Sequence, residues 1–232
     1  MIWYFLVVFM AELQEINVIY EDNHLLVVEK PVNMPVCEDE SRDRDLLNVL
    51  KDYIKVKYNK PGNVYLGLVH RLDRPVGGVM VFAKTSKAAS RLSSQVSNRD
   101  LDKTYVAVVS GKTPDKGEMF DYMVKDSKKN MSYVTDKVNG KEAKLKFKRL
   151  GYKDGCSLAE IYLETGRSHQ IRVQFASRGF PLIGDAKYNK NHDGKTSVAL
   201  FAKRLSFVHP VSKERLSFEL DIPNRYPFSL FK

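Results

Sequence analysis

The stretch that decides the fold runs from His70 to Lys84 and reads His-Arg-Leu-Asp-Arg-Pro-Val-Gly-Gly-Val-Met-Val-Phe-Ala-Lys. Its first half is polar and holds one proline and two glycines, whereas the run from Val79 to Ala83 is apolar. Proline biases the residue before it toward extended backbone, and glycine permits a positive φ or the close approach of another backbone. The stretch therefore predicts a turn that feeds a buried strand, with Asp73 on a rigid turn at the edge of a sheet.

Asp73 also has a simpler interpretation. A carboxylate that lies between Arg71 and Arg74 can be a solvated surface group that pairs with either arginine, and most charged turn residues are of this kind. The rest of the chain has to decide between the two interpretations.

Composition limits the class of protein. The chain has 232 residues, of which 43% are hydrophobic, so it can bury the core of one compact domain. Its 38 Lys and Arg residues against 28 Asp and Glu residues give a formal net charge of +10. Such a balance favours an anionic partner, with nucleic acid first and an acidic membrane surface second.

The sequence argues against a disulfide-linked protein, a metalloprotein and a membrane-anchored protein. Cys37 and Cys156 are far apart in the sequence, so we expect no disulfide framework and a reducing cytoplasm. The five histidines show no metal-ligand spacing, so no metal site is predicted. The apolar start of the chain is too short to span a bilayer and has no cleavage pattern. Residues 1–16 are therefore predicted to be an apolar extension of unknown role, with no membrane anchor.

Hydrophobic periodicity predicts a mixed α/β (α+β) fold. Strands are expected over residues 18–24, 25–31, 64–69, 79–83, 103–109, 143–147, 157–164, 197–207 and 215–220, and helices over residues 41–58, 86–97 and 167–178. Residues 112–140 are expected to be rich in loops. Because no repeat or low-complexity linker interrupts this pattern, we expect one domain with a mixed, largely antiparallel sheet flanked by helices.

The helix expected from Arg167 concentrates polar chemistry at its start. Its first backbone amides favour an anion, which predicts a phosphate-binding end. Arg172 shares a helical turn with apolar neighbours and could reach inward to pair with a buried Asp73, keeping that carboxylate ionised as a nucleophile requires. Arg172 could equally cover the core from the surface, and Tyr105 could be an ordinary core aromatic. His169 and His70 are expected to be capping groups rather than bases.

Six blocks of the chain, in order, resemble the RluA-type pseudouridine synthases. The three signature blocks are His70-Arg71-Leu72-Asp73, Lys103 to Ala107, and Thr165 to Val173, and the supporting blocks are residues 20–31, 183–188 and 207–210. The resemblance covers roughly residues 17–223 and implies a pseudouridine synthase catalytic domain over residues 17–232. It also implies an isomerase that converts uridine in RNA to its C-glycoside isomer without a cofactor or metal.

The resemblance implies a role for individual residues. Asp73 would be the catalytic carboxylate that attacks or deprotonates the ribose, Tyr105 would stack on the target base, and Arg172 would orient Asp73. Arg71 would fill the gap left by the flipped nucleotide, which agrees with the need of a flipped base for an aromatic surface and a positive groove. The remaining implied RNA contacts are Arg74, Arg167 and His169.

The chain departs from the family pattern at two places. Val76-Gly77-Gly78 stands where Thr-Ser-Gly is usual, and Gln174 stands where histidine is common. The alternative function is a catalytically inactive RNA-binding module or ribosome assembly factor, although such a binder needs no buried acid. A metal-dependent nuclease would need a carboxylate cluster, which is not evident. The expected partner is ribosomal or transfer RNA, while the target uridine and the oligomeric state are not predicted.

Overall fold

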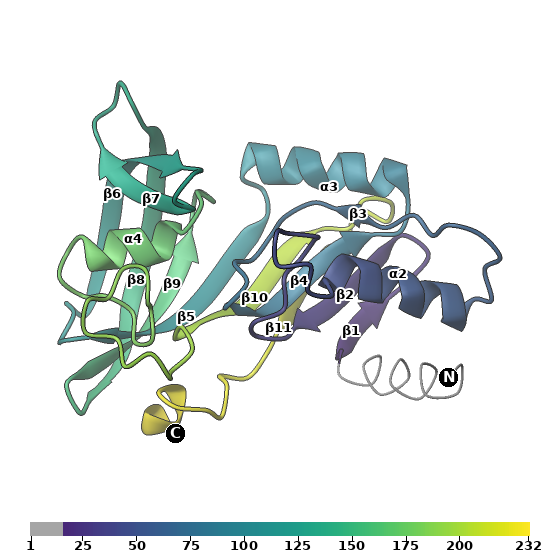
Figure 1. Ribbon diagram of the computed structural model, residues 1–232. Helices are drawn as coiled ribbons and strands as arrows, with labels where there is room; N and C mark the ends of the chain where they lie inside the picture. The colour runs from purple at the N-terminus through teal and green to yellow at the C-terminus, as the bar shows by residue number, and fades with distance from the viewer. Residues whose placement is uncertain (1–15) are drawn as a thin grey trace. The chain divides into compact units, whose positions relative to one another are not determined.

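The computed structural model describes residues 16–232, which gather into two compact units. Unit 1 consists of residues 16–101 and 206–218, and unit 2 consists of residues 102–205 and 219–232. The chain therefore passes between the units three times, and each unit is described by itself (Figure 1). The prediction of a single catalytic domain over residues 17–232 stays a prediction, and most of the apolar extension lies outside the described residues.

Unit 1 is built around a strand that is buried along its whole length. Its elements are β1 (Val18–Glu21), β2 (Leu25–Lys30), α2 (Leu46–Lys57), β3 (Gly67–Leu68), β4 (Gly77–Ala83) and α3 (Ser86–Asn98). Strand β4 pairs antiparallel with β2 on one side and with β3 on the other, and β2 pairs antiparallel with β1. Because β4 has neighbours on both edges and is buried on both faces, it reads as the near-continuous apolar run seen in the sequence.

The helices of unit 1 begin where side chains cap them. Asp45 accepts a hydrogen bond from the backbone amide of Asn48 at 3.0 Å, and Thr85 accepts one from the amide of Ala88 at 3.2 Å. An N-cap satisfies one of the amides that a helix start leaves unpaired. Helix α2 therefore begins at Leu46 rather than at the predicted residue 41, whereas α3 begins where it was predicted.

Unit 2 is a layer of antiparallel strands. In spatial order these are β5 (Asp102–Ser110), β9 (Cys156–Leu163), β8 (Lys141–Lys153), β6 (Lys116–Asp126) and β7 (Met131–Thr135). The remaining elements are α4 (Gln170–Ala176), β10 (Leu200–Val208), which begins in unit 2 and ends in unit 1, β11 (Arg215–Glu219) and a final 3₁₀ turn (Phe228–Phe231). The structure thus confirms the α+β class and the antiparallel pairing.

The prediction that residues 112–140 are rich in loops was wrong. Strands β6 and β7 form a hairpin there, and β6 pairs with β8 over its first eight residues. Charged side chains and a glycine hide the alternation in this segment, and the partner strand supplies the pairing that local sequence does not reveal. Strand β3 is likewise shorter than the predicted residues 64–69.

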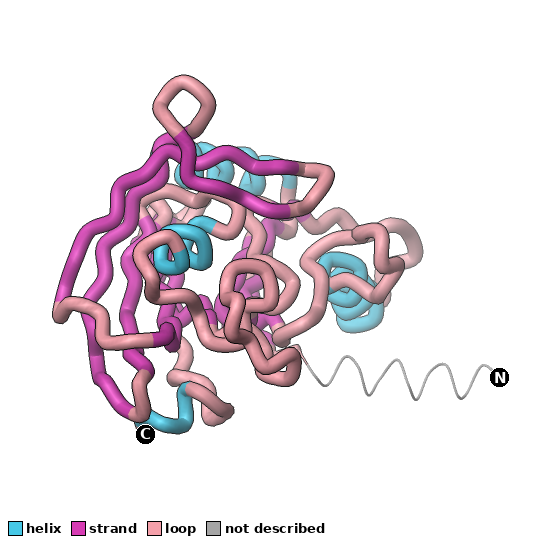
Figure 2. The backbone as a smooth tube through the Cα atoms, turned by 60° about the vertical axis from the view of Figure 1, so that its left-hand side comes forward, coloured by secondary structure: helices cyan, strands magenta, loops and turns pink. Residues whose placement is uncertain are grey.

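Helix α4 covers one face of the unit 2 strands (Figure 2). The rings of Phe147 in β8 and Phe175 in α4 lie 5.3 Å apart, centroid to centroid. Tyr105 faces the same side, because it pairs in register with Ile161, which in turn pairs with Phe147. The register therefore places Tyr105 on the face that α4 covers.

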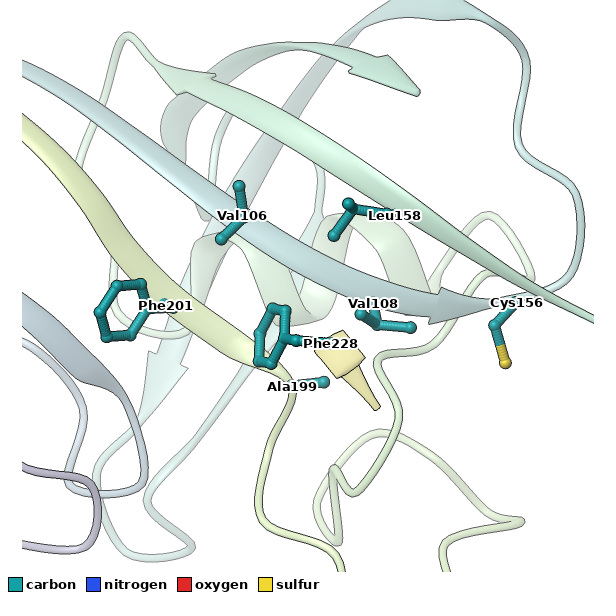
Figure 3. Packing of buried hydrophobic residues seen from close by; sticks show 7 residues of the cluster. All are labelled: Val106, Val108, Cys156, Leu158, Ala199, Phe201 and Phe228. Atoms are coloured by element: carbon teal, nitrogen blue, oxygen red, sulfur yellow. The ribbon is translucent and has the colours of Figure 1, made fainter. Parts of the chain in front are cut away.

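A second apolar cluster of unit 2 includes the final 3₁₀ turn. It joins strands β5, β9 and β10 to that turn, as Figure 3 shows: Val106, Val108, Cys156, Leu158, Ala199, Phe201 and Phe228. Phe228 is fully buried. Side chains alternate along a strand, so Val106 points to the face opposite Tyr105. The layer is therefore packed on both faces, by α4 on one and by the C-terminal turn on part of the other.

Candidate active site

Asp73 lies on a hydrogen-bonded turn directly before β4. Its carbonyl oxygen accepts a hydrogen bond from the amide of Val76 at 2.9 Å, which closes the turn, and its side chain is half-buried. Gly78 has a φ of 124°, a conformation that favours glycine. The predicted rigid turn that feeds a buried strand is therefore confirmed.

The turn is fastened to β2 by a buried lysine. Lys30 is only 1% exposed, and its ammonium group donates to the carbonyl oxygens of Pro31 at 2.8 Å, Arg74 at 3.0 Å and Val76 at 2.8 Å. Burial lowers the pKa of Lys30 to about 7, while the charge of Asp73 acts in the opposite direction and raises it. Burial therefore outweighs the attraction of Asp73 and favours the neutral form of Lys30.

Sequence reasoning gave Lys30 no role. The sequence signal that could have found it is a lysine at the end of a strand whose other residues are nearly all buried. Two of its three acceptors belong to the turn that follows Asp73, so the packing of β2 against this turn decides its function.

Arg74 is engaged by an acidic loop of unit 1. Its guanidinium forms an ion pair with Asp43, lies 3.9 Å from Asp39, and donates to the hydroxyl of Ser41 at 2.9 Å and the carbonyl of Asn33 at 3.1 Å. The hydrogen bond from Arg74 lowers the pKa of the Asp43 carboxyl. The predicted contact of Arg74 with RNA stays a prediction, and it would compete with these partners.

The neighbours of Asp73 on its N-terminal side differ in exposure. Arg71 is exposed, while Leu72 is buried beneath it. The ring nitrogen Nε2 of His70 accepts a hydrogen bond from the amide of Val81 at 3.2 Å. This contact agrees with the expectation that His70 caps backbone groups.

Arg172 makes a bidentate ion pair in unit 2. Its Nε donates to Oδ2 of Asp185 at 2.8 Å and its Nη2 donates to Oδ1 at 2.7 Å. Arg172 is 3% exposed and Asp185 is fully buried, so Arg172 is not a surface arginine. Sequence reasoning expected Asp73 as its partner and missed Asp185. Because Asp73 belongs to unit 1, the pairing of Arg172 with Asp73 stays a prediction.

His169 and Tyr188 complete this buried cluster. Nδ1 of His169 lies 2.7 Å from the hydroxyl of Tyr188, which accepts a hydrogen bond from the amide of Ser132 at 2.8 Å. The guanidinium carbon of Arg172 lies 5.2 Å from the centroid of the Tyr188 ring, within cation–π range. His169 is only 8% exposed, and its predicted contact with RNA stays a prediction.

The start of α4 differs from the prediction. The helix has seven residues and begins at Gln170, because the residue before it, His169, has a φ of 54°. The amide of Arg167 donates to the side-chain oxygen of Gln170 at 3.0 Å, and Nε of Arg167 donates to the carbonyl of Glu142 at 2.8 Å. The predicted phosphate-binding end was placed at Arg167, three residues before the helix begins, and it stays a prediction.

Gln174 replaces the common histidine without losing hydrogen bonds. Its Nε2 donates to Asp121 at 2.7 Å and to the carbonyl of Ala143 at 3.3 Å, while its oxygen accepts from Gln170 at 3.0 Å. These bonds tie α4 to β6 and β8, so this departure from the family pattern serves the packing of α4.

Metal-binding clusters and membrane-spanning helices are both absent from the described residues. Within residues 16–232, no three His, Cys, Asp or Glu side chains gather in a way that could hold a metal ion. In the same part of the chain, none of the helices is long and apolar enough to cross a bilayer.

Comparison with known proteins gives the same family throughout. A family profile described as RNA pseudouridylate synthase matches residues 24–177. Ribosomal large subunit pseudouridine synthase D of Zymomonas mobilis is 32% identical over 221 residues, covering 90% of this chain and 69% of that protein. The uncharacterized RNA pseudouridine synthase YhcT of Bacillus subtilis is 32% identical over 215 residues, covering 91% and 70%.

A solved structure shares the fold. Human RNA Pseudouridylate Synthase Domain Containing 4 matches with a TM-score of 0.80 at 22% identity, covering 98% of this chain and 97% of that chain. The class of protein is therefore an isomerase that acts on RNA and forms pseudouridine. The chain belongs to the RNA pseudouridylate synthase family, and the RluA-type resemblance is confirmed.

Proposed function

We propose that Asp73 is the carboxylate that carries out the isomerisation. It attacks or deprotonates the ribose, the bond between C1′ and N1 of the uridine breaks, and the uracil turns within the site. A bond between C1′ and C5 then forms, C5 loses its proton and N1 gains one. The observation that carries this assignment is the fastening of the Asp73 turn by Lys30, which gives the carboxylate a fixed backbone.

Tyr105 and Arg172 are proposed to serve the same reaction. Tyr105 provides the surface on which the target base stacks, and its position on the same face of the unit 2 strands as the helix that carries Arg172 supports this role. Arg172 orients Asp73 and keeps it ionised, and its burial with a second carboxylate supports its being a fixed rather than a mobile cation.

The RNA contacts are proposed to fall into two groups. Arg71 and Arg167 contact the RNA directly, with Arg71 filling the gap that the flipped nucleotide leaves, and the exposure of Arg71 supports this role. Arg74 contacts the RNA by exchanging its carboxylate partners for a phosphate. His169 is buried, so we propose that it supports RNA binding indirectly, through its hydrogen bond with the Tyr188 hydroxyl.

The proposed substrate is ribosomal RNA of the large subunit, modified in the cytoplasm. Two observations support it: the relative from Zymomonas mobilis is named for that subunit, and the chain carries a net charge of +10. Transfer RNA is the competing substrate, and the two are separated by assaying purified fractions of each.

The test is release of tritium from RNA that carries 5-tritiated uridine, prepared from a strain that lacks this protein. We expect the wild type to release tritium in excess EDTA, from the large-subunit fraction, and Asp73→Asn to release none. Release only from transfer RNA would change the substrate assignment. RNA binding without release by the wild type would favour an inactive binding module.

A further inference from the structure

We propose that Asp185 is a positioning residue of this enzyme, which fixes the guanidinium of Arg172 and acts on the reaction only through it. The proposal rests on the proposed function of Arg172 and extends it to a residue outside the three signature blocks.

The first step is the geometry of the pair. Asp185 engages Nε and Nη2 of Arg172 at 2.8 and 2.7 Å, which is the fork-to-fork arrangement of a guanidinium and a carboxylate. Two parallel hydrogen bonds stop the guanidinium from rotating within its plane. Asp185 thereby sets the direction of Nη1, the nitrogen that it does not engage.

The second step is that Asp185 is itself fixed. Its Oδ1 accepts hydrogen bonds from the amides of Lys187 at 3.0 Å and Tyr188 at 3.3 Å. Its own amide donates to the carbonyl of Leu182 at 3.3 Å. Asp185 therefore has its backbone and its Oδ1 anchored, so it can transmit a fixed orientation to Arg172.

The third step is the support beneath the guanidinium. The Tyr188 ring lies 5.2 Å from the guanidinium carbon, and its hydroxyl is tied to His169 and to the amide of Ser132. Asp185 thus restrains the guanidinium at its edge, while Tyr188 restrains it at its face.

The buried pair of Arg172 and Asp185 is better explained by positioning of the guanidinium than by stabilisation of the fold. A buried ion pair is poor evidence of stabilisation, because well-packed apolar residues of similar volume are often as stable. The segment directly after α4 already has a less buried pair for anchoring, between Arg178 and Asp121 at 2.8 Å. A second, fully buried pair on the face that holds Tyr105 is better explained by the chemistry than by the packing.

The experiment measures single-turnover tritium release with excess enzyme on large-subunit ribosomal RNA that carries 5-tritiated uridine. Asp185→Asn keeps the shape of the side chain and removes its charge. We expect the rate to fall by roughly 10²-fold, as for a small misplacement of a catalytic group, with RNA affinity within about twofold of the wild type. Asp121→Asn is the matched control, because it removes the carboxylate partner of Arg178, an arginine just after α4, and we expect it to keep the wild-type rate.

A double-mutant cycle tests whether Asp185 acts through Arg172. In an Arg172→Lys background, where the bidentate pair no longer exists, we expect Asp185→Asn to cause no further loss of rate. An equal loss in both backgrounds would show a structural role and overturn the proposal. The proposal would also be overturned if Asp185→Asn kept the wild-type rate, or if Asp121→Asn lost as much rate as Asp185→Asn.

A second variant covers misfolding. If Asp185→Asn does not fold, Asp185→Glu keeps the charge but moves it by one methylene, and we expect a lowered rate with intact RNA affinity. A wild-type rate for this variant would count against positioning. Absence of release by the wild type would overturn the proposed function and this proposal together, whereas release by the wild type with unaffected variants overturns positioning alone.

Discussion

The ammonium nitrogen of Lys30 donates to the carbonyl oxygen of Val76 at 2.8 Å and so joins residues 46 positions apart. The same nitrogen holds the carbonyl of Arg74, so the backbone after Asp73 is bound at two points to a buried strand. The hydroxyl residues usual in the family at this turn are replaced here by Val76 and Gly77. The contacts from Lys30 therefore help to hold the turn in place, together with those of Arg74 to Asn33 and Ser41.

Lys30→Met is expected to change how stability depends on pH. Folding lowers the pKa of Lys30 to about 7 from 10.5, so between these values the unfolded chain binds one more proton than the folded chain. The free energy of unfolding of the wild type therefore gains about 1.4 kcal/mol per pH unit from this group as pH rises through this window. Urea unfolding of both proteins at pH 7, 8 and 9 checks this. The free energy of unfolding of the wild type minus that of the variant should increase from pH 7 to pH 9. If this quantity does not change with pH, the lowered pKa of Lys30 is contradicted.

Asp73→Asn should fold like the wild type and lose turnover. The substitution keeps the volume of the side chain and leaves the backbone bond between Asp73 and Val76 intact. We expect the rate of tritium release to fall by at least about 10³-fold, because an amide cannot act as a nucleophile or base, while the melting temperature stays within a few degrees. A variant with substantial activity would move the catalytic role away from Asp73.

Tyr105→Phe and Tyr105→Ala should differ. If Tyr105 mainly stacks on the base, Phe retains the stacking surface, whereas Ala loses about 1–3 kcal/mol, or roughly 5- to 150-fold in rate. Because Tyr105 is buried, Ala should also lower the melting temperature. Equal loss of rate in both variants would assign the role to the hydroxyl, with tritium release as the measurement.

Asp39→Asn combined with Asp43→Asn should strengthen RNA binding. The change removes the carboxylate partners of Arg74 and makes that guanidinium available to a phosphate. Filter binding at several salt concentrations should show higher affinity and a slope of log K against log salt that is steeper by about 1.

The matched control for this prediction is Glu38→Gln combined with Glu40→Gln. It makes the same change in net charge in the same loop but leaves Asp39 and Asp43, the two carboxylate partners of Arg74, in place. Equal effects in the two double variants would mean that only the overall charge matters.

Local patterns predicted most elements of the fold. The Asp73 turn, β4 and α3 follow from a proline, glycines, an apolar run and a helix cap, all within a few residues of one another. The hairpin of β6 and β7 could not be predicted in this way, because its strands depend on pairing with β8. Helix α4 was placed too early because the αL conformation of His169 is not visible in the sequence.

The site shows the same division. Asp73, Tyr105 and Arg172 were identifiable as candidates because their motifs are local and resemble a known family. Lys30 and Asp185 lie in the supporting blocks but received no role, since the contact of each with a distant residue cannot be inferred from the sequence. The sequence does not show whether a lysine or an aspartate is buried or exposed to solvent. The burial of Lys30 and Asp185 is therefore known only from the structure.

The return of residues 206–218 to unit 1 limits how the protein can be dissected. A fragment that ended at Leu101 would lack the partners of three unit 1 side chains: His209 for Asp22 at 2.9 Å, the carbonyl of Pro210 for Arg91 at 2.6 Å, and the backbone of Val208 for Gln95 at 2.7 and 2.8 Å. Splitting the gene at the unit boundary would therefore not yield an autonomous module. An isolated unit 1 would need residues 206–218 as well, for example joined by a linker to the end of the segment that contains α3.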